Sequence, residues 1–179
     1  MAPALYTKIG DAGTTRTYSN DIVEKDSLVI STNGDIDFVL ASLDMAKLHI
    51  KNKEYIAILD YVDRKLWQLG GEVSLGGTGR NINDEITEED IAMIERKIQD
   101  LGGYPKQFLR FRDVEAVHLN ECRVRLRMLE RNMVPMLRDG KIRPVCFKYI
   151  NRVSDLLFML AYSIEKQKQE SETKLGRFV

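Results

Sequence analysis

The chain has 179 residues, of which 44% are hydrophobic and 30% charged, an ordinary mixture for one globular domain. Lys and Arg total 27, as do Asp and Glu, and this balance argues against non-specific nucleic-acid binding, which needs a cationic surplus. We expect neither a membrane span nor a secretory signal. Cys122 and Cys146, the only cysteines, lie in apolar helical patterns, which favours buried thiols and a reducing, cytoplasmic compartment.

The first 33 residues differ from the rest. Residues 7–20 are rich in Gly, Thr, Asp and Asn and sustain no hydrophobic period, which predicts an ordered loop. With Lys8, Gly10 and Gly13, this loop can present backbone N–H groups and hydroxyls to phosphate oxygens. It is not a Walker P-loop, because the GxxxxGK[ST] pattern is absent. Alone, it is a weak signal for anion binding.

Two helices are predicted next. Apolar residues recur at helical spacing up to Ile50, behind a polar start signal of Thr32, Asn33 and Asp35. A second apolar stripe covers residues 56–69 and stops at or shortly after Gly70-Gly71.

Three further helices follow a glycine-rich connection. The third begins at a Thr87 N-cap, carries acidic residues in its first turn and ends at Gly102-Gly103. The fourth starts near Asp113 and runs to about Leu137. The fifth starts after Pro144, a residue tolerated in a first helical turn, and continues to Ile164.

These patterns predict an all-α fold, a five-helix bundle with ferritin-like up-down packing and an ordered N-terminal loop. We expect a single domain over residues 1–179. It divides into an N-terminal loop at 1–33, a helical bundle at 34–168 and a polar tail at 169–179 that frays.

The fourth helix carries a polar arc beside its apolar face. Advancing about 100° per residue, the arc gathers Asn120, Arg123, Arg127, Glu130 and Arg131. A charge stripe is usually a solvated flank. This one borders the apolar face, which places it at a packing seam, where arginine forks suit phosphate or carboxylate recognition.

The fifth helix places two polar residues, Asn151 and Asp155, on one face of an otherwise apolar stretch. A buried Asp155 requires a cationic partner, for which the fourth helix offers candidates. An Asp–Arg link that only joins two helices is an equal alternative for Asp155.

Three segments in this order resemble the PduO-type corrinoid adenosyltransferases. YTKIGDAGTTRTYS near the N-terminus is similar to the YTKTGDxGTT signature of that family. RVRLRMLER on the fourth helix resembles RxxxRRxER, and YINRVSDLLFMLA on the fifth resembles YLNRLSDYLFxLAR. WQLGGEV at 67–73 is a fainter match to LFxLGxDLA. The resemblance spans nearly the whole chain.

The resemblance implies a homotrimer of five-helix bundles with active sites between subunits, and transfer of the 5′-deoxyadenosyl group of ATP to cob(I)alamin. Mg²⁺ would be bound through the ATP phosphates, and the resemblance assigns it no side-chain ligand. Catalysis would rest on Arg127, Arg131 and Asn151. ATP contacts implied by the resemblance are Thr7, Lys8, Gly10, Thr15, Arg16, Lys25, Arg127, Glu130, Arg131 and Asn151. On the cobalamin side, Phe108 would lie beneath the corrin ring and Asp37 would pair with Arg123 across the subunit interface.

The implied chemistry agrees with the residue types. Cobalt is the nucleophile and attacks C5′, so no protein nucleophile or base is required, and no Ser/His/Asp or Cys/His arrangement is evident. The protein has to align C5′ and neutralise the leaving triphosphate. A cobalamin reductase and an adenosylcobalamin-dependent client enzyme are the implied protein partners.

The chain departs from the family chiefly on the corrinoid side. The YGxVDELNS motif is NGDIDFVLAS at 33–42, the FxLPGG motif is FLRFRDVE at 108–115, and the second arginine of the RR pair is Met128. These losses leave open a non-catalytic sensor or carrier that binds ATP or adenosylcobalamin. A helical scaffold is a third alternative, but it would have no use for the TKIGDAGTT loop.

Overall fold

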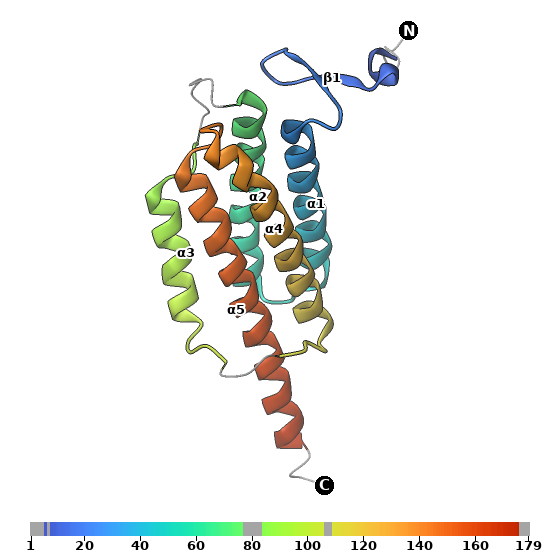
Figure 1. Cartoon of the computed structure of the whole chain (residues 1–179). Coiled ribbons are helices and arrows are strands. Elements are labelled where there is room, and N and C mark those ends of the chain that lie inside the picture. Colours follow the sequence, from blue (N-terminus) through green and yellow to red (C-terminus); the bar gives the residue numbers. More distant parts are fainter. Residues whose placement is uncertain (1–5, 7, 77–83, 106–108, 176–179) are drawn as a thin grey trace.

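The structure, a computed structural model, describes residues 6, 8–76, 84–105 and 109–175. These residues form five α-helices, which confirms the predicted helical architecture: α1 Leu28–His49, α2 Lys53–Leu75, α3 Glu88–Asp100, α4 Val114–Arg138 and α5 Pro144–Leu175. Successive helices run up and down the bundle, and the N-terminal segment stands at the end where α1 begins (Figure 1).

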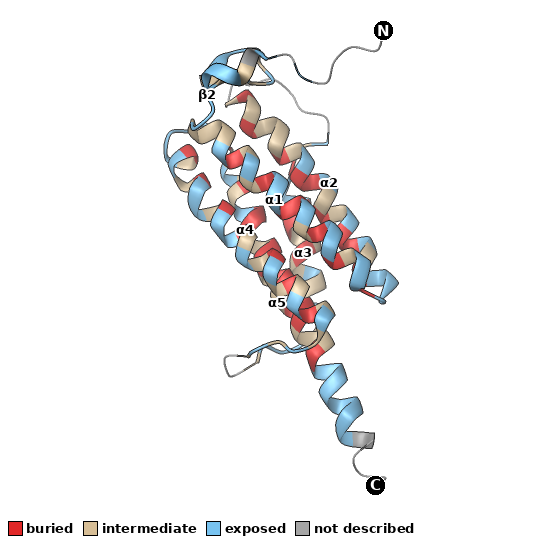
Figure 2. Ribbon diagram, turned by 90° about the vertical axis from the view of Figure 1, so that its right-hand side faces the viewer, coloured by how far each residue is buried: buried red, intermediate tan, exposed pale blue. Residues whose placement is uncertain are grey.

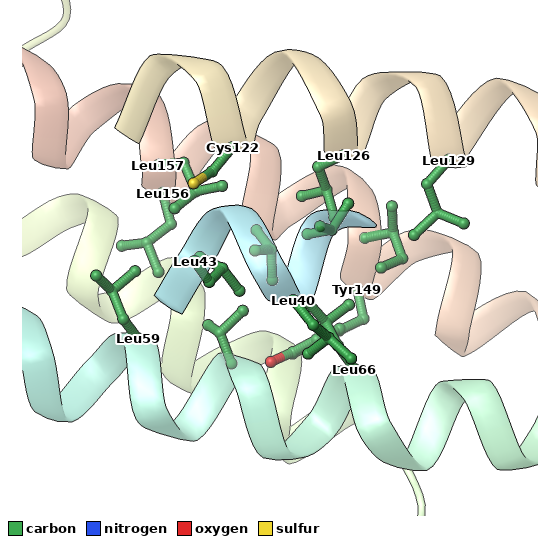
Figure 3. Packing of buried hydrophobic residues seen from close by; sticks show 14 of the residues in the cluster. Leu40, Leu43, Leu59, Leu66, Cys122, Leu126, Leu129, Tyr149, Leu156 and Leu157 are labelled. Carbon is green, nitrogen blue, oxygen red and sulfur yellow. The ribbon is translucent and has the colours of Figure 1, made fainter. Parts of the chain in front are cut away.

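All five helices contribute buried apolar residues to the core. Helix α4 packs against both α5 and α1, while α1 also packs against α2, and α3 covers α5. Apolar side chains from α1, α2, α4 and α5 meet in the centre (Figure 3), among them Leu43, Leu59, Leu126, Tyr149 and Leu157. Both cysteines are buried in this bundle, as predicted.

Three helix starts agree with the sequence patterns. Thr87 caps α3 by accepting from the Asp90 N–H, and the Asp90 carboxylate accepts from the Thr87 N–H at 2.7 Å, which completes a capping box. Asp113 caps α4 by accepting from the Glu115 N–H at 2.8 Å. Pro144 is the first residue of α5.

The predicted start of the first helix is wrong. Helix α1 begins at Leu28, and Thr32 and Asn33 lie inside it instead of capping it. Thr32 is buried, and the Asn33 side chain donates to Ser74 Oγ on α2 at 2.8 Å. Asn33 therefore resembled a helix-start residue in the sequence, although its side chain makes a contact between two helices.

The N-terminal segment contains regular secondary structure, where the sequence predicted an ordered loop. It contains a short 3-10 helix, Ile9–Ala12, and an antiparallel hairpin of β1, Thr14–Arg16, and β2, Ile22–Glu24. Hydroxyl and carboxylate side chains bind one another across the turn, from Thr17 to Ser19 at 2.9 Å and from Ser19 to Asp21 at 2.6 Å. The sequence did not predict the hairpin, because strands of three residues carry no measurable period.

The part of the predicted fraying tail that the structure describes, residues 169–175, is helical. Helix α5 continues to Leu175, and the hydroxyls of Ser171 and Thr173 donate to backbone carbonyls four residues earlier, at 2.8 Å each. Figures 1 and 2 show this end of α5 extending past the bundle with an exposed surface. Within the described residues, none of the helices combines the length and apolarity of a membrane span.

Candidate functional site

The polar arc of α4 lies at the seam with α5, as its pattern predicts. Half-buried Glu130 accepts a hydrogen bond from Asn151 Nδ2 of α5 at 2.8 Å. About two turns earlier in α4, Arg123 Nε donates to Asn120 Oδ1 at 2.9 Å, and its guanidinium lies 5.8 Å from the Phe158 ring centroid. The inner edge of the arc is therefore held against α5.

The outer part of the arc is cationic and exposed. Burial, together with the nearby charge of Arg127, lowers the pKa of Arg123. Arg127 and Arg131 are exposed, and neither makes a hydrogen bond or an ion pair within the part of the chain that the structure describes. These guanidinium groups can donate paired hydrogen bonds to an anionic ligand, which would also reduce the repulsion between them.

Asp155 does not pair with α4 in the way considered from the sequence. Its partner is Arg152 on its own helix, at 3.5 Å. Burial raises the pKa of Asp155; the Arg152 charge opposes this shift and the Glu130 charge adds to it. Asp155 therefore belongs to the electrostatic surroundings of the arc without binding it directly.

Two residues next to Asn151 were not singled out from the sequence. Arg152 NH1 donates to Asn151 Oδ1 at 3.1 Å, and Arg152 Nε donates to Glu95 Oε1 of α3 at 2.7 Å. The available signals for Arg152 were its position beside Asn151 and its match to the arginine of the YLNRLSDYLFxLAR signature. Glu95 gave none, because it is one of many charged residues on an amphipathic helix and lies far from Asn151 in the sequence.

The hairpin segment brings several of its predicted ATP contacts together. Gly10 lies so close to the Lys25 side chain that a Cβ atom at position 10 would stand 3.0 Å from Lys25 Nζ. The Lys25 backbone N–H donates to the Gly13 carbonyl at 2.8 Å. Lys8, just before the 3-10 helix, adopts a left-handed backbone with φ 62°. The segment thus presents two exposed lysines, Lys8 and Lys25, around a glycine-containing turn.

The remaining hairpin residues lie on β1. Thr15 is half-buried and pairs with Val23, and Arg16 is exposed, donating from NH1 to the Asn20 carbonyl at 3.1 Å. Thr7 lies outside the described residues.

Arg131, the last residue of the arc, lies toward the end of the bundle that carries the hairpin. Asn132 Nδ2 of α4 donates to Asp35 Oδ2 of α1 at 2.7 Å, so the start of α1 is level with the last turns of α4. The hairpin stands above that end in Figure 1. Among the described residues, no hydrogen bond or ion pair joins residues 8–25 to Arg127 or Arg131 within this chain.

The structure describes two of the three predicted cobalamin-side residues. Asp37 is exposed on α1 and has no ion-pair partner in the described part of this chain, while Arg123 lies at the α4–α5 seam. Phe108 lies outside the described residues. In the ranges that the structure covers, no group of three or more His, Cys, Asp or Glu side chains is arranged to hold a metal ion.

The fold and this geometry define a class: a helical-bundle protein with arginines at an α4–α5 seam available to an anionic ligand. Comparison with known proteins makes the assignment specific. The chain matches the family model described as cobalamin adenosyltransferase over residues 5–164, so it belongs to that family, which confirms the resemblance found in the sequence.

Similar proteins are named corrinoid adenosyltransferases. A corrinoid adenosyltransferase of Citrobacter freundii is 28% identical over 162 residues, covering 88% of this chain and 92% of that protein. Corrinoid adenosyltransferase PduO of the same organism is 29% identical over 163 residues, which are 88% of this chain and 49% of that longer relative. Human corrinoid adenosyltransferase MMAB is 25% identical over 181 residues, which are 95% of this chain and 72% of the human protein.

Solved structures share the fold. A point variant of a PduO-type ATP:corrinoid adenosyltransferase of Lactobacillus reuteri, complexed with cobalamin and ATP, superposes with a TM-score of 0.83 at 22% identity, covering 93% of this chain and 96% of that one. Another variant of the same type, complexed with ATP, has a TM-score of 0.82 at 23% identity, covering 92% and 96%.

Proposed function

We propose that this protein is an ATP:cob(I)alamin adenosyltransferase. It transfers the 5′-deoxyadenosyl group of MgATP to cob(I)alamin and releases triphosphate. The observation that carries this proposal is the row of exposed arginines on α4 beside Asn151 of α5, together with the family membership. The similar proteins named for this activity, and the fold neighbour complexed with cobalamin and ATP, support it.

The arc and the hairpin segment both bind the nucleotide. A Co–C bond forms to C5′ as the C5′–O bond breaks, and negative charge gathers on the departing triphosphate. Arg127 and Arg131 stabilise that charge, and Asn151 helps to hold the nucleotide in line. The hairpin segment supplies further phosphate contacts, through Thr7, Lys8, Gly10, Thr15, Arg16 and Lys25. Glu130 orients Asn151, and Mg²⁺ enters on the ATP phosphates.

The working unit is a homotrimer with sites between subunits, in which the hairpin of one subunit reaches the arc of its neighbour. One observation supports this arrangement. Neighbouring helices α1 and α4 expose apolar side chains, which suit a surface that becomes buried: Phe38, Met45 and Leu48 on α1, and Val117, Val124 and Met128 on α4.

On the corrinoid side, Asp37 pairs with Arg123 of the adjacent subunit, and Phe108 fills the space beneath the corrin ring. An apolar side chain in that place favours a cobalt without its lower axial ligand, which is easier to reduce. The protein acts in the cytoplasm with a cobalamin reductase upstream and an adenosylcobalamin-dependent client downstream.

Turnover tests this function. The purified protein is incubated with MgATP and chemically reduced cob(I)alamin, and the Co–C bond is followed by absorbance while triphosphate is quantified. The proposal requires equal amounts of alkylated corrinoid and triphosphate. MgATP binding without either product would instead favour the non-catalytic sensor or carrier, and absence of binding as well as product would exclude both.

A further inference from the structure

Both ends of the Asn151 side-chain amide are held by charged neighbours. Its Nδ2 donates to Glu130 Oε1 at 2.8 Å, and its Oδ1 accepts from Arg152 NH1 at 3.1 Å. A carboxylate can only accept and a guanidinium can only donate. A flipped amide would set its oxygen against Glu130 and its NH2 group against Arg152, so these two neighbours fix one orientation.

Arg152 is itself held by a third helix. Its Nε donates to Glu95 Oε1 of α3 at 2.7 Å, and its NH1 lies 3.5 Å from Asp155 Oδ2. The hydrogen bond to Glu95 is the main cause of a raised pKa at Arg152, which keeps the guanidinium charged. Only a planar fork can bind an amide and two carboxylates from one rigid group, and the single ammonium of lysine cannot.

We propose that Arg152 and Glu95 are positioning residues for MgATP. Arg152 fixes the orientation of the Asn151 amide, and Glu95 fixes Arg152, so that α3 acts on the nucleotide site without touching the ligand. The inference rests on the proposed function, which makes Asn151 an ATP contact. One N–H of the oriented amide remains for the nucleotide, and it requires no rearrangement when the ligand arrives.

A purely structural role for the Glu95–Arg152 pair is the competing explanation, because the pair also joins α3 to α5. The chain provides a matched control for that role. Lys148 Nζ of α5 binds Glu88 Oε2 of α3 at 2.8 Å, and both of these side chains are exposed. This second pair joins the same two helices and has no contact with Asn151.

The test compares the two pairs by MgATP dissociation constant, kcat and melting temperature in the full-length protein. Arg152→Lys and Glu95→Ala should each weaken MgATP binding about tenfold, the effect of losing one hydrogen bond to a charged group. Glu95→Gln, whose amide oxygen still accepts from Nε, should recover most of that loss. Lys148→Met and Glu88→Ala should leave MgATP binding unchanged.

A double-mutant cycle separates positioning from additive destabilisation. In an Asn151→Ala background, Arg152→Lys should produce no further loss of MgATP affinity, because the amide it orients is gone. A full tenfold loss in that background, or an equal loss in Glu88→Ala, would overturn the inference while wild-type turnover still supported the proposed function. A wild-type protein that neither binds MgATP nor forms the Co–C bond would remove both.

Discussion

At the scale of single residues, the account depends on the shape of the guanidinium group. Arg127 is exposed at the α4–α5 seam without an ion-pair partner in the described part of the chain, so its donors are available to phosphate. Its charge also contributes to the lowered pKa of the neighbouring Arg123. A bound polyanion would be stabilised by both residues, and the geometry of each donor would then matter as well as its charge.

Arg127→Lys tests this dependence on geometry. The substitution keeps the charge and removes the planar pair of donors, so we expect kcat/KM for ATP to fall roughly 100-fold. Arg96→Lys, at an exposed position on α3 outside the site, is the matched control and should retain full activity. Equal kcat/KM values for the two variants would exclude Arg127 from the site.

A second residue-scale prediction concerns stability in acid. Burial alone would raise the pKa of Asp90, but hydrogen bonds from Tyr61 and the Thr87 backbone and the charge of Lys65 lower it below its ordinary value. An acid with a lowered folded pKa stabilises the fold above its unfolded pKa of about 3.9, and this stabilisation disappears as the pH falls through the folded pKa.

Asp90→Asn should therefore lower the free energy of unfolding at pH 7 by about 1–3 kcal/mol, because it weakens hydrogen bonds to a charged acceptor. The same variant should lose less stability than the wild type between pH 5 and pH 3. Urea denaturation at several pH values measures both effects. A variant whose acid dependence matches the wild type would show that another carboxylate is responsible.

At the scale of elements, the sequence predicted those features of the helices that depend on residues close together in the chain. The starts of α3 and α4 follow from Thr87 and Asp113, whose caps bind backbone atoms two or three residues away. The polar arc of α4 follows from helical spacing, and its contact with Asn151 at the seam agrees with that prediction.

Interactions between distant residues could not be predicted in this way. Asn33 binds Ser74, 41 positions further along, and Glu95 binds Arg152, 57 positions further along. Read along the chain, Asn33 resembles part of a helix start and Glu95 resembles ordinary polar surface. The family resemblance indicated that Asn151 is a site residue, but it did not indicate which neighbours orient its amide.

Thr87→Ala tests the capping box of α3. Loss of the hydroxyl leaves the Asp90 N–H without its acceptor, and we expect the free energy of unfolding to fall by about 1 kcal/mol. Thr87→Ser retains the hydroxyl and should stay close to the wild type. If serine and alanine proved equally destabilising in urea, the hydroxyl would not be the cause.

At the scale of the whole molecule, assembly is the central question. The exposed apolar side chains on α1 and α4 adjoin the arc and form one surface with it, since these two helices are neighbours. Burial of this surface against a second subunit would complete the site and remove apolar area from water in the same step.

Met128→Glu should shift the protein from the proposed trimer to a monomer, because it places a charge in the middle of the proposed interface. Trp67→Glu provides a control, since Trp67 is exposed on α2, outside the surface formed by α1 and α4. Sedimentation velocity distinguishes the states. Retention of the trimer by Met128→Glu would move the interface elsewhere.

The most direct test of the central claim is complementation between two inactive variants, Lys8→Ala in the hairpin segment and Arg127→Ala in the arc. If each site combines the hairpin of one subunit with the arc of another, mixed trimers re-formed from equal amounts should regain about one quarter of wild-type adenosyltransferase activity. Mixing Arg127→Ala with Arg131→Ala should restore none, because both defects lie in the same arc. Trimers shown to be mixed that remain as inactive as the separate variants would contradict a site shared between subunits.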